Sequence, residues 1–395
     1  MQYPPARAVV PAISAMINAA NFDELRRQIT AQVRADERTL VYLRDTIAPL
    51  QANVRRIQRR TTTAVSLVAT DGGENQVHFD PFLIDLVRVV DSSSNEYCLE
   101  VISPTTPLAE IEARQFGPGG APITPLGRMM DFLGVRELRH LSPMIQSHNG
   151  RRPSNAGWIR AYRELVEWAV LFAIVREKDF GSDTVIIFDG LLRSLKFSGD
   201  LFPKLIAGIG EAIDHHRRSR RNVYVAGIAK RSKVLDRYRL AMGLEAVMTG
   251  TFASYVEVPR TIEQSVYRWS DYARGDDQVE PGTEINRFVG GKMFFVKFGS
   301  HRHDPVWPID ILQRQVAEAP VIFGSILADA ENGFPVPLYP RCLQKAHEFA
   351  AMVEFDRIIL QDAILASIRD VLGAEAPALD TYRVQDADPA RRRYG

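Results

Sequence analysis

Two apolar runs stand out in a chain whose hydrophobic positions otherwise recur mostly at helical spacing. One is continuous and covers residues 185–188, and the other covers residues 64–70 and includes Ser66 and Thr70. Each is followed at once by an Asp-Gly pair, Asp189-Gly190 and Asp71-Gly72. A continuous apolar run of this length is typical of a strand buried on both faces. An Asp-Gly pair after a strand most simply forms a turn. Two such copies also predict two carboxylates at one rim of a sheet, where they could share a divalent cation.

Residues 21–59 predict one long amphipathic helix, with an apolar stripe against a strongly charged face. Pro49 should kink this helix or divide it in two. The stripe either packs on its own domain or forms an arm that docks on a second copy or on a partner. It consists of Leu25, Ile29, Val33, Leu40, Leu43, Ile47, Leu50, Val54 and Ile57.

The remaining pattern alternates between strands and helices. Strands are expected at residues 76–90, 96–102, 223–228, 252–258 and 292–298, with a turn at 91–95. Helices are expected at residues 158–178, 200–218, 233–242, 310–318 and 340–365. Helices that alternate with strands after an initial hairpin predict a mixed α/β sheet with helices on both faces.

Composition limits the classes of function. The chain has 395 residues, 46% of them hydrophobic and 25% charged, as expected for a soluble globular protein of one large or two ordinary domains. Its net charge of +1 provides no overall attraction for nucleic acid, so any such binding needs local basic patches. The uncharged stretch at residues 8–22 is shorter than the roughly 20 residues of a spanning helix, so we expect a cytoplasmic protein without membrane association.

The candidate chemistry is a set of carboxylates. The sequence lacks a GxxxxGK[ST] loop, a GxSxG elbow and an HExxH motif. What remains is Asp71, Glu167 and Asp189, with His347 late in the chain. Hard oxygen ligands with one imidazole suit Mg²⁺ or Mn²⁺, and two such ions about 3.5–4 Å apart can activate water for phosphodiester hydrolysis. Glu164, one helical turn from Glu167, is an alternative helical ligand.

A basic segment at the predicted junction of a strand and a helix is the candidate for holding a nucleic-acid backbone, since helix N-termini attract phosphate. It consists of Lys230, Arg231, Ser232 and Lys233. A solvated helix start is the simpler interpretation of these four residues taken alone. Elsewhere, His301 and His303 are expected on a surface strand.

Five segments, taken in order, resemble the NurA nuclease family, whose members work with the hexameric HerA ATPase. They are LVATDGG (67–73), EWAVLF (167–172), VIIFDG (185–190), VAGIAKRSK (225–233) and FPVPLYPRCLQKAH (334–347). The resemblance implies an RNase H-like core over residues 61–360. Gly73 and Leu191 depart from the family pattern, which has serine at both places.

The same resemblance implies a role for each matching residue. Asp71 and Asp189 would be strand-end metal ligands, Glu167 the helical ligand, and Tyr339 and His347 would complete the catalytic site. In the basic segment, Lys230 and Ser232 would correspond to the family's basic and hydroxyl positions.

We therefore expect a Mn²⁺- or Mg²⁺-dependent deoxyribonuclease that hydrolyses phosphodiesters by two-metal activation of water. The resemblance implies a homodimer docked on a HerA-type ring, acting in DNA end processing and repair or in phage defence. The expected organisation is an N-terminal helical arm (1–60), a nuclease domain (61–360) and a C-terminal helix end with a tail (361–395). Two alternatives stay open: a NurA-like adaptor that regulates the ATPase without cutting DNA, and another RNase H-like enzyme such as a resolvase or an RNA-cutting effector.

Overall fold

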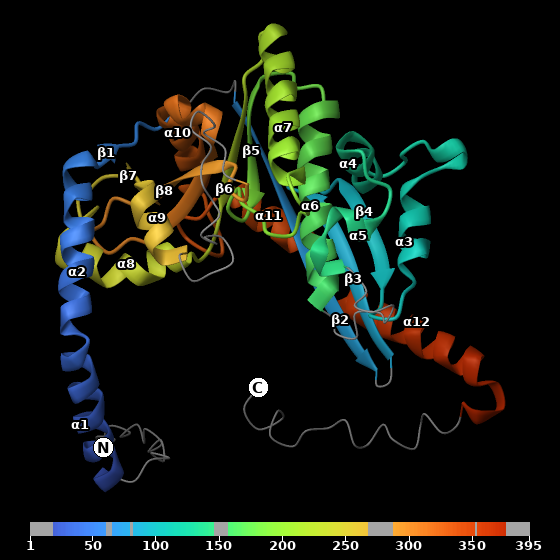
Figure 1. Cartoon of the computed structure of the whole chain (residues 1–395), viewed down its shortest axis with the longest axis horizontal. Helices are drawn as coiled ribbons and strands as arrows, with labels where there is room; N and C mark the ends of the chain where they lie inside the picture. Colours follow the sequence, from blue (N-terminus) through green and yellow to red (C-terminus); the bar gives the residue numbers. More distant parts are fainter. Residues whose placement is uncertain are drawn as a thin grey trace, which may run out of the picture.

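A nine-stranded sheet organises the described part of the chain, which in this computed structural model comprises residues 19–60, 65–79, 82–145, 157–267, 287–351 and 354–376. The strand order is β1-β7-β8-β9-β6-β5-β2-β3-β4 (Figure 1). The strands are β1 (Arg55–Arg56), β2 (Val65–Phe79), β3 (Phe82–Asp91), β4 (Glu96–Ile102), β5 (Asp183–Asp189), β6 (Val223–Ile228), β7 (Ser254–Glu257), β8 (Gly291–Lys297) and β9 (Val306–Leu312). Within β2 the structure describes the backbone alone.

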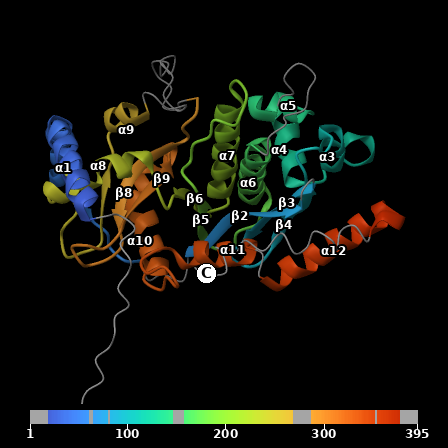
Figure 2. The ribbon, with the colours of Figure 1, turned by 90° about the horizontal axis from the view of Figure 1, so that it is seen from below.

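Helices cover both faces of this sheet, as Figure 2 shows. The α-helices are α1 (Ala19–Ala35), α2 (Glu37–Ile47), α3 (Leu108–Gln115), α4 (Pro125–Leu133), α5 (Leu138–Leu141), α6 (Gly157–Glu177), α7 (Leu201–Arg218), α8 (Lys233–Leu244), α9 (Arg260–Tyr267), α10 (Ala319–Ala330), α11 (Arg341–Ala350) and α12 (Glu354–Leu372). α4, α6 and α7 lie on one side of the sheet, and α10 and α11 lie on the other. No helix in the described ranges is long and apolar enough to cross a bilayer.

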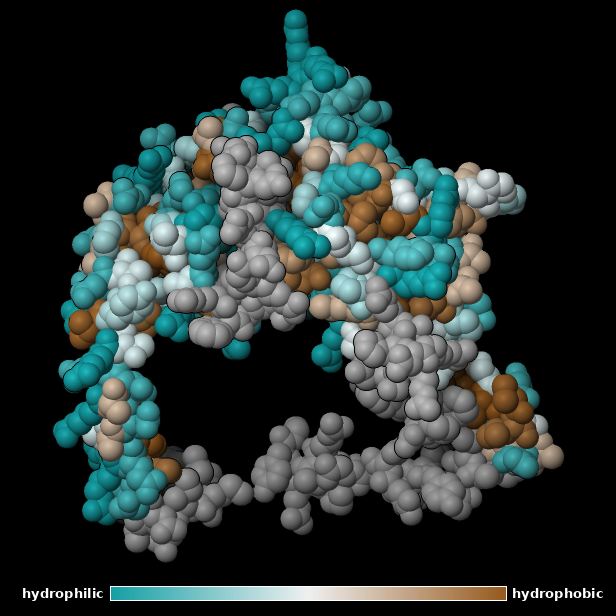
Figure 3. Space-filling model, viewed as in Figure 1, coloured by the Kyte–Doolittle hydropathy of each residue, from teal (hydrophilic) through white to brown (hydrophobic). Residues whose placement is uncertain are grey.

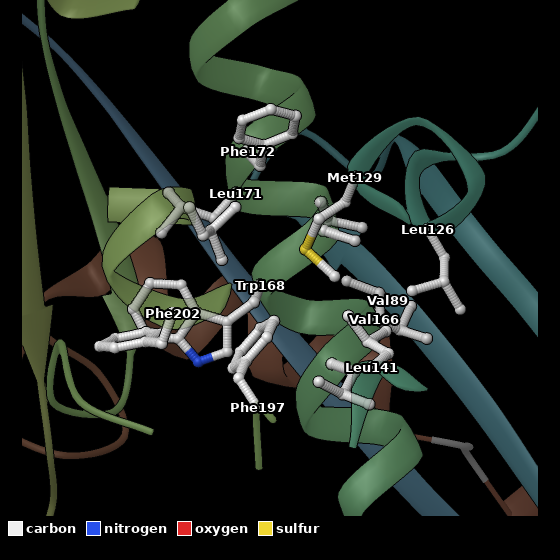
Figure 4. Packing of buried hydrophobic residues seen from close by; sticks show 14 of the residues in the cluster. Val89, Leu126, Met129, Leu141, Val166, Trp168, Leu171, Phe172, Phe197 and Phe202 are labelled. Carbon is white, nitrogen blue, oxygen red and sulfur yellow. The ribbon is translucent and has the colours of Figure 1, made fainter. Parts of the chain in front are cut away.

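The side chains of β5 point alternately to the two faces of the sheet, and both faces are covered by helices. Ile186 and Phe188 belong to the hydrophobic cluster under α6 and α7, whereas Val185 and Ile187 belong to the cluster under α10 and α11. On the α6 side, Trp168 packs on Phe188 with ring centroids 4.9 Å apart. Figure 4 shows Trp168 together with Phe197 and Phe202 in this cluster. Because both faces are covered there, every position from Val185 to Phe188 is apolar.

The sheet is mixed, which confirms the α/β class. β2 pairs in parallel with β5, and β5 in parallel with β6. β2 pairs antiparallel with β3, and β3 antiparallel with β4 across the predicted turn at 91–95. β9 then joins β6 antiparallel and carries β8, β7 and β1 outward.

Four predictions of secondary structure were wrong. β2 does not end at Asp71 but continues to Phe79, and the predicted strand 76–90 is divided between β2 and β3. Residues 310–312 belong to β9, and only Gln313–Glu318 forms a 3-10 helix, so no α-helix covers 310–318. His301 and His303 lie in a bend and turn after β8 instead of on a strand.

The N-terminal prediction was correct for part of its length. Helix is interrupted at Asp36, ends at Ile47, and is followed by a 3-10 helix, Ala48–Asn53, and by β1. Leu43, Ile47 and Leu50 pack with α8 and its neighbours. By contrast, the α1 part of the stripe is solvent-exposed: Phe22, Leu25, Ile29 and Val33 are 41–64% exposed.

The C-terminal helix predicted at 340–365 is divided into α11 and α12. α12 also leaves apolar side chains exposed, among them Ile358, Ile359 and Val371, and brown surface marks its region at the lower right of Figure 3. The tail beyond residue 376 and the loop predicted at 270–284 lie outside the described residues.

Candidate active site

The two Asp-Gly pairs meet in the middle of the sheet. β2 and β5 are parallel neighbours, with Thr70 opposite Phe188. Asp71 and Asp189 are the next residues of the two strands, so their backbones occupy adjacent positions. The side chain of Asp71 lies outside what the structure describes. The strand register nevertheless puts the backbones of the two aspartates side by side on neighbouring strands, as a shared cation site would need.

Asp189 has a cation and a phenol beside its carboxylate. Lys230 Nζ lies 3.4 Å from Asp189 Oδ2, and the Tyr339 hydroxyl lies 3.5 Å from Asp189 Oδ1. The Asp189 side chain is 18% exposed, so the carboxylate is accessible from solvent although its strand is buried. Lys230 follows β6, and Tyr339 precedes α11. Three separate parts of the chain therefore converge on one carboxylate.

Tyr339 is positioned by contacts to the loop that carries it. The Trp307 indole N–H donates to the Leu338 carbonyl at 2.7 Å, and the Trp307 and Tyr339 rings pack with centroids 4.8 Å apart. Leu338 has φ +58°, a left-handed conformation that is costly for a residue with a side chain. The Gln344 amide donates to the Tyr339 carbonyl at 2.9 Å. Trp307 and Gln344 thus act as a clamp on the backbone on either side of the phenol.

A close backbone approach fixes the end of β5. Gly190 has φ +138°, and its N–H donates to the Ile228 carbonyl at 2.8 Å. A Cβ on Gly227 would lie 2.4 Å from the Gly190 carbonyl oxygen. Position 227 therefore has no room for a side chain while Gly190 keeps this conformation, and the chain leaves β5 tightly against β6.

The two candidate helical glutamates have different surroundings. Glu164 accepts a hydrogen bond from the Ser194 hydroxyl at 2.5 Å, and burial raises the pKa of its carboxyl. Glu167 forms an ion pair with Arg163 at 3.2 Å. Both lie on α6, which packs on the face of the sheet opposite α11. Glu167 and Tyr339 therefore approach the sheet from opposite sides.

The other predicted residues lie around this group. His347 is exposed on α11, a helix that packs against β2. Ser232 is buried, and its hydroxyl accepts from the Leu235 N–H at 3.2 Å as the N-cap of α8. Arg231 and Lys233 are exposed on either side of it. The basic segment therefore does start a helix, as predicted.

A divalent cation fits the chemistry of these groups. A partly exposed carboxylate, a second aspartate at the adjacent strand position and a nearby phenol are hard oxygen donors. Among the side chains that the structure describes, no three acidic, histidine or cysteine groups are close enough to hold a metal ion, and the Asp71 side chain is outside that set.

The sequence patterns indicated Asp189 and Lys230, and the family resemblance implied Tyr339, but neither gave a sign of Trp307 or Gln344. Trp307 lies on β9, a strand that the sequence analysis missed, and its role depends on a hydrogen bond to a residue 31 positions later. A single Trp between Val306 and Pro308 forms no sequence pattern that would distinguish a residue that positions Tyr339 from one that only packs in the core.

Comparison with known proteins gives likeness in structure alone. No family model and no curated protein matches the sequence. Solved structures of NurA nucleases match most of the chain. The NurA nuclease from Sulfolobus solfataricus is 12% identical with a TM-score of 0.46, covering 90% of this chain and 99% of its own. A NurA structure bound to dAMP and manganese is 9% identical with a TM-score of 0.39, covering 83% of this chain and 94% of its own. Residue roles in this chain therefore rest on its own sequence and geometry.

Proposed function

We propose that the protein is a metal-dependent deoxyribonuclease of NurA type. The observation that carries the proposal is the adjacency of Asp71 and Asp189 on parallel neighbouring strands, with Lys230 and Tyr339 at the Asp189 carboxylate. The succession β4-β3-β2-β5-β6, in which an antiparallel meander is followed by two parallel strands, is the part that we assign to an RNase H-like core.

In this proposal Asp71, Asp189, Glu167 and His347 hold Mn²⁺ or Mg²⁺. Two such ions, when bound, supply activation of water and neutralise charge on the leaving oxygen. Because α6 lies across the sheet from Tyr339, Glu167 can join the site only around the end of β5. Comparing Glu167→Gln with Glu164→Gln tests which glutamate is needed.

The chain's own groups would orient and neutralise the substrate. Lys230 places a positive charge where a phosphate can approach Asp189. The N-terminus of α8, capped by Ser232 and flanked by Arg231 and Lys233, adds main-chain N–H donors for the backbone of the nucleic acid. Tyr339, held by the clamp, fixes the direction of the Asp189 carboxylate.

We further propose that the protein works in the cytoplasm as a homodimer on a HerA-type ATPase ring, in DNA end processing or phage defence. The support is the exposed apolar stripe of α1, which suits a helix-to-helix contact. Sedimentation of the protein alone and mixed with the ATPase tests both contacts. A monomer that does not sediment with the ATPase would refute them.

The decisive experiment measures degradation of linear DNA with Mn²⁺, with and without the ATPase. We expect cleavage by the wild-type protein and a loss of at least about 10³-fold in Asp189→Asn, since removing a metal ligand removes the metal-assisted step. The melting temperature should change little, because a partly exposed ion pair contributes about 0–1 kcal/mol. Absence of cleavage under both conditions would favour the adaptor, and preference for junctions or RNA in a competition assay would favour the other RNase H-like enzymes.

A further inference from the structure

A pocket of about 480 Å³ lies by the C-terminal end of α10. Leu338 contributes to its wall, and Tyr339 is the next residue. The rest of the wall comes from β1 and from the segments at 251–253 and 298–300. Its principal side chains are Arg56, Arg59, Thr251, Phe252, Ser300 and Leu338.

The pocket combines an aromatic ring with an arginine. The Arg56 guanidinium carbon lies 5.8 Å from the centroid of the Phe252 ring, and Arg56 itself is exposed. Arg59 is already neutralised by Glu331 at 2.6 Å, so Arg56 is the cation better able to receive an anion. An aromatic face suits a nucleobase, and a guanidinium suits a phosphate.

A buried lysine underlies the same walls. Lys297 is fully buried, and its ammonium donates to the main-chain carbonyls of Gly250 and His301. These carbonyls belong to the two segments that carry Thr251 and Ser300, so Lys297 ties the two walls together. Burial lowers the pKa of Lys297, and the negative charge of Asp304 acts against that shift. Arg56 is therefore the cation that we assign to an incoming anion.

We infer that this pocket binds one nucleotide, with its phosphate on Arg56 and its base against Phe252. This inference deepens the proposed function and rests on it: the nucleotide would be a unit of the same DNA chain whose phosphodiester reaches Asp189. A free nucleotide has the same chemistry, and the experiment below distinguishes the two sources.

The test uses the full-length protein carrying Asp189→Asn, so that DNA stays intact. Binding of an end-labelled single-stranded oligodeoxynucleotide is measured by fluorescence anisotropy, and binding of dTMP by calorimetry. Arg56→Ala should weaken binding at least about tenfold, since a charge-assisted hydrogen bond contributes about 1.5–3 kcal/mol. Thr251→Asp, which places a carboxylate in the wall, should weaken it as well.

Arg55→Ala is the matched control, because Arg55 is the preceding residue of β1, is also exposed, and lines a different pocket. It should leave affinity within about twofold. Equal losses in both arginine variants would mean a general charge effect and would overturn the inference, as would unchanged binding in Arg56→Ala. If Arg56-dependent binding is seen with dTMP alone, the ligand is a free nucleotide; if it is seen with the oligonucleotide, the ligand is a unit of the chain.

The experiments distinguish a wrong assignment of the pocket from a wrong assignment of nuclease activity. A wild-type protein that does not cut DNA but binds dTMP through Arg56 would refute the nuclease and keep the pocket. A protein that cuts DNA with unchanged KM and affinity in Arg56→Ala would refute only the pocket.

Discussion

Replacing Trp307 by Phe should slow catalysis while leaving the fold intact. The change keeps an aromatic ring against Tyr339 and removes only the indole N–H that donates to Leu338 at 2.7 Å. A net hydrogen bond contributes about 1 kcal/mol. The left-handed conformation of Leu338 costs about 1–2 kcal/mol. The hydrogen bond to Leu338 therefore offsets a conformational cost of similar size. Without that hydrogen bond, the loop can leave the conformation that presents the Tyr339 phenol.

About 1 kcal/mol changes a two-state population about fivefold. We therefore expect kcat on linear DNA with Mn²⁺ to fall up to about fivefold, with KM nearly unchanged, because the variant leaves Lys230 and Arg56, the substrate contacts that we propose, untouched. The melting temperature should fall by less than about 4 °C. Hydrogen–deuterium exchange gives a readout that does not depend on activity: exchange should rise in the peptide containing Leu338 and Gln344.

Trp158→Phe provides the control. Trp158 is buried on α6, and among the described residues its indole nitrogen has no hydrogen-bond partner, so this variant loses an N–H that donates to nothing. It should not alter exchange in the Tyr339 loop. If Trp307→Phe leaves that exchange and kcat at wild-type values, or if Trp158→Phe has the same effects, Trp307 does not position Tyr339.

Two further predictions concern buried ionisable groups. Burial raises the pKa of Glu164, so the wild-type protein loses stability as pH rises through that pKa. Glu164→Gln can still accept a hydrogen bond from Ser194, and it should flatten the dependence of melting temperature on pH. Parallel curves of melting temperature against pH for the variant and the wild type would contradict this. Arg193 donates to Asp310 at 2.7 and 2.9 Å and lies 3.1 Å from Glu263. Arg193→Met should lower the free energy of unfolding by about 3–5 kcal/mol, because it removes the guanidinium from the buried carboxylate of Asp310, whereas Glu263 keeps its contact with Arg260 at 3.1 Å. Urea titration measures this loss, and an unchanged free energy of unfolding would contradict the prediction.

The sequence was sufficient to predict the central strands because their apolar runs match burial on two faces. It also predicted that Asp71 and Asp189 lie together. It failed on the end of β2, because Asp-Gly favours a turn while pairing with β3 carries the strand through Gly72 and Gly73 to Phe79. Local turn preference is weaker here than the hydrogen bonds that an adjacent strand supplies.

The missed strand β9 has a different cause. Asp310 in the interior of an apolar strand is unfavourable by itself, so the pattern favoured a helix start there. In the structure Asp310 is fully buried and paired with Arg193, 117 residues earlier. No local pattern contains that partner, and the same is true of Trp307 and Leu338.

The hydroxyl and the carboxylate that meet in the candidate site are 150 residues apart in sequence. During translation the ribosome delivers Asp71 and Asp189 long before Tyr339 and α11. A nascent chain released early would contain the acidic strands without the phenol that faces them. If the protein is the nuclease that we propose, its site therefore stays incomplete until nearly the whole chain has emerged and folded.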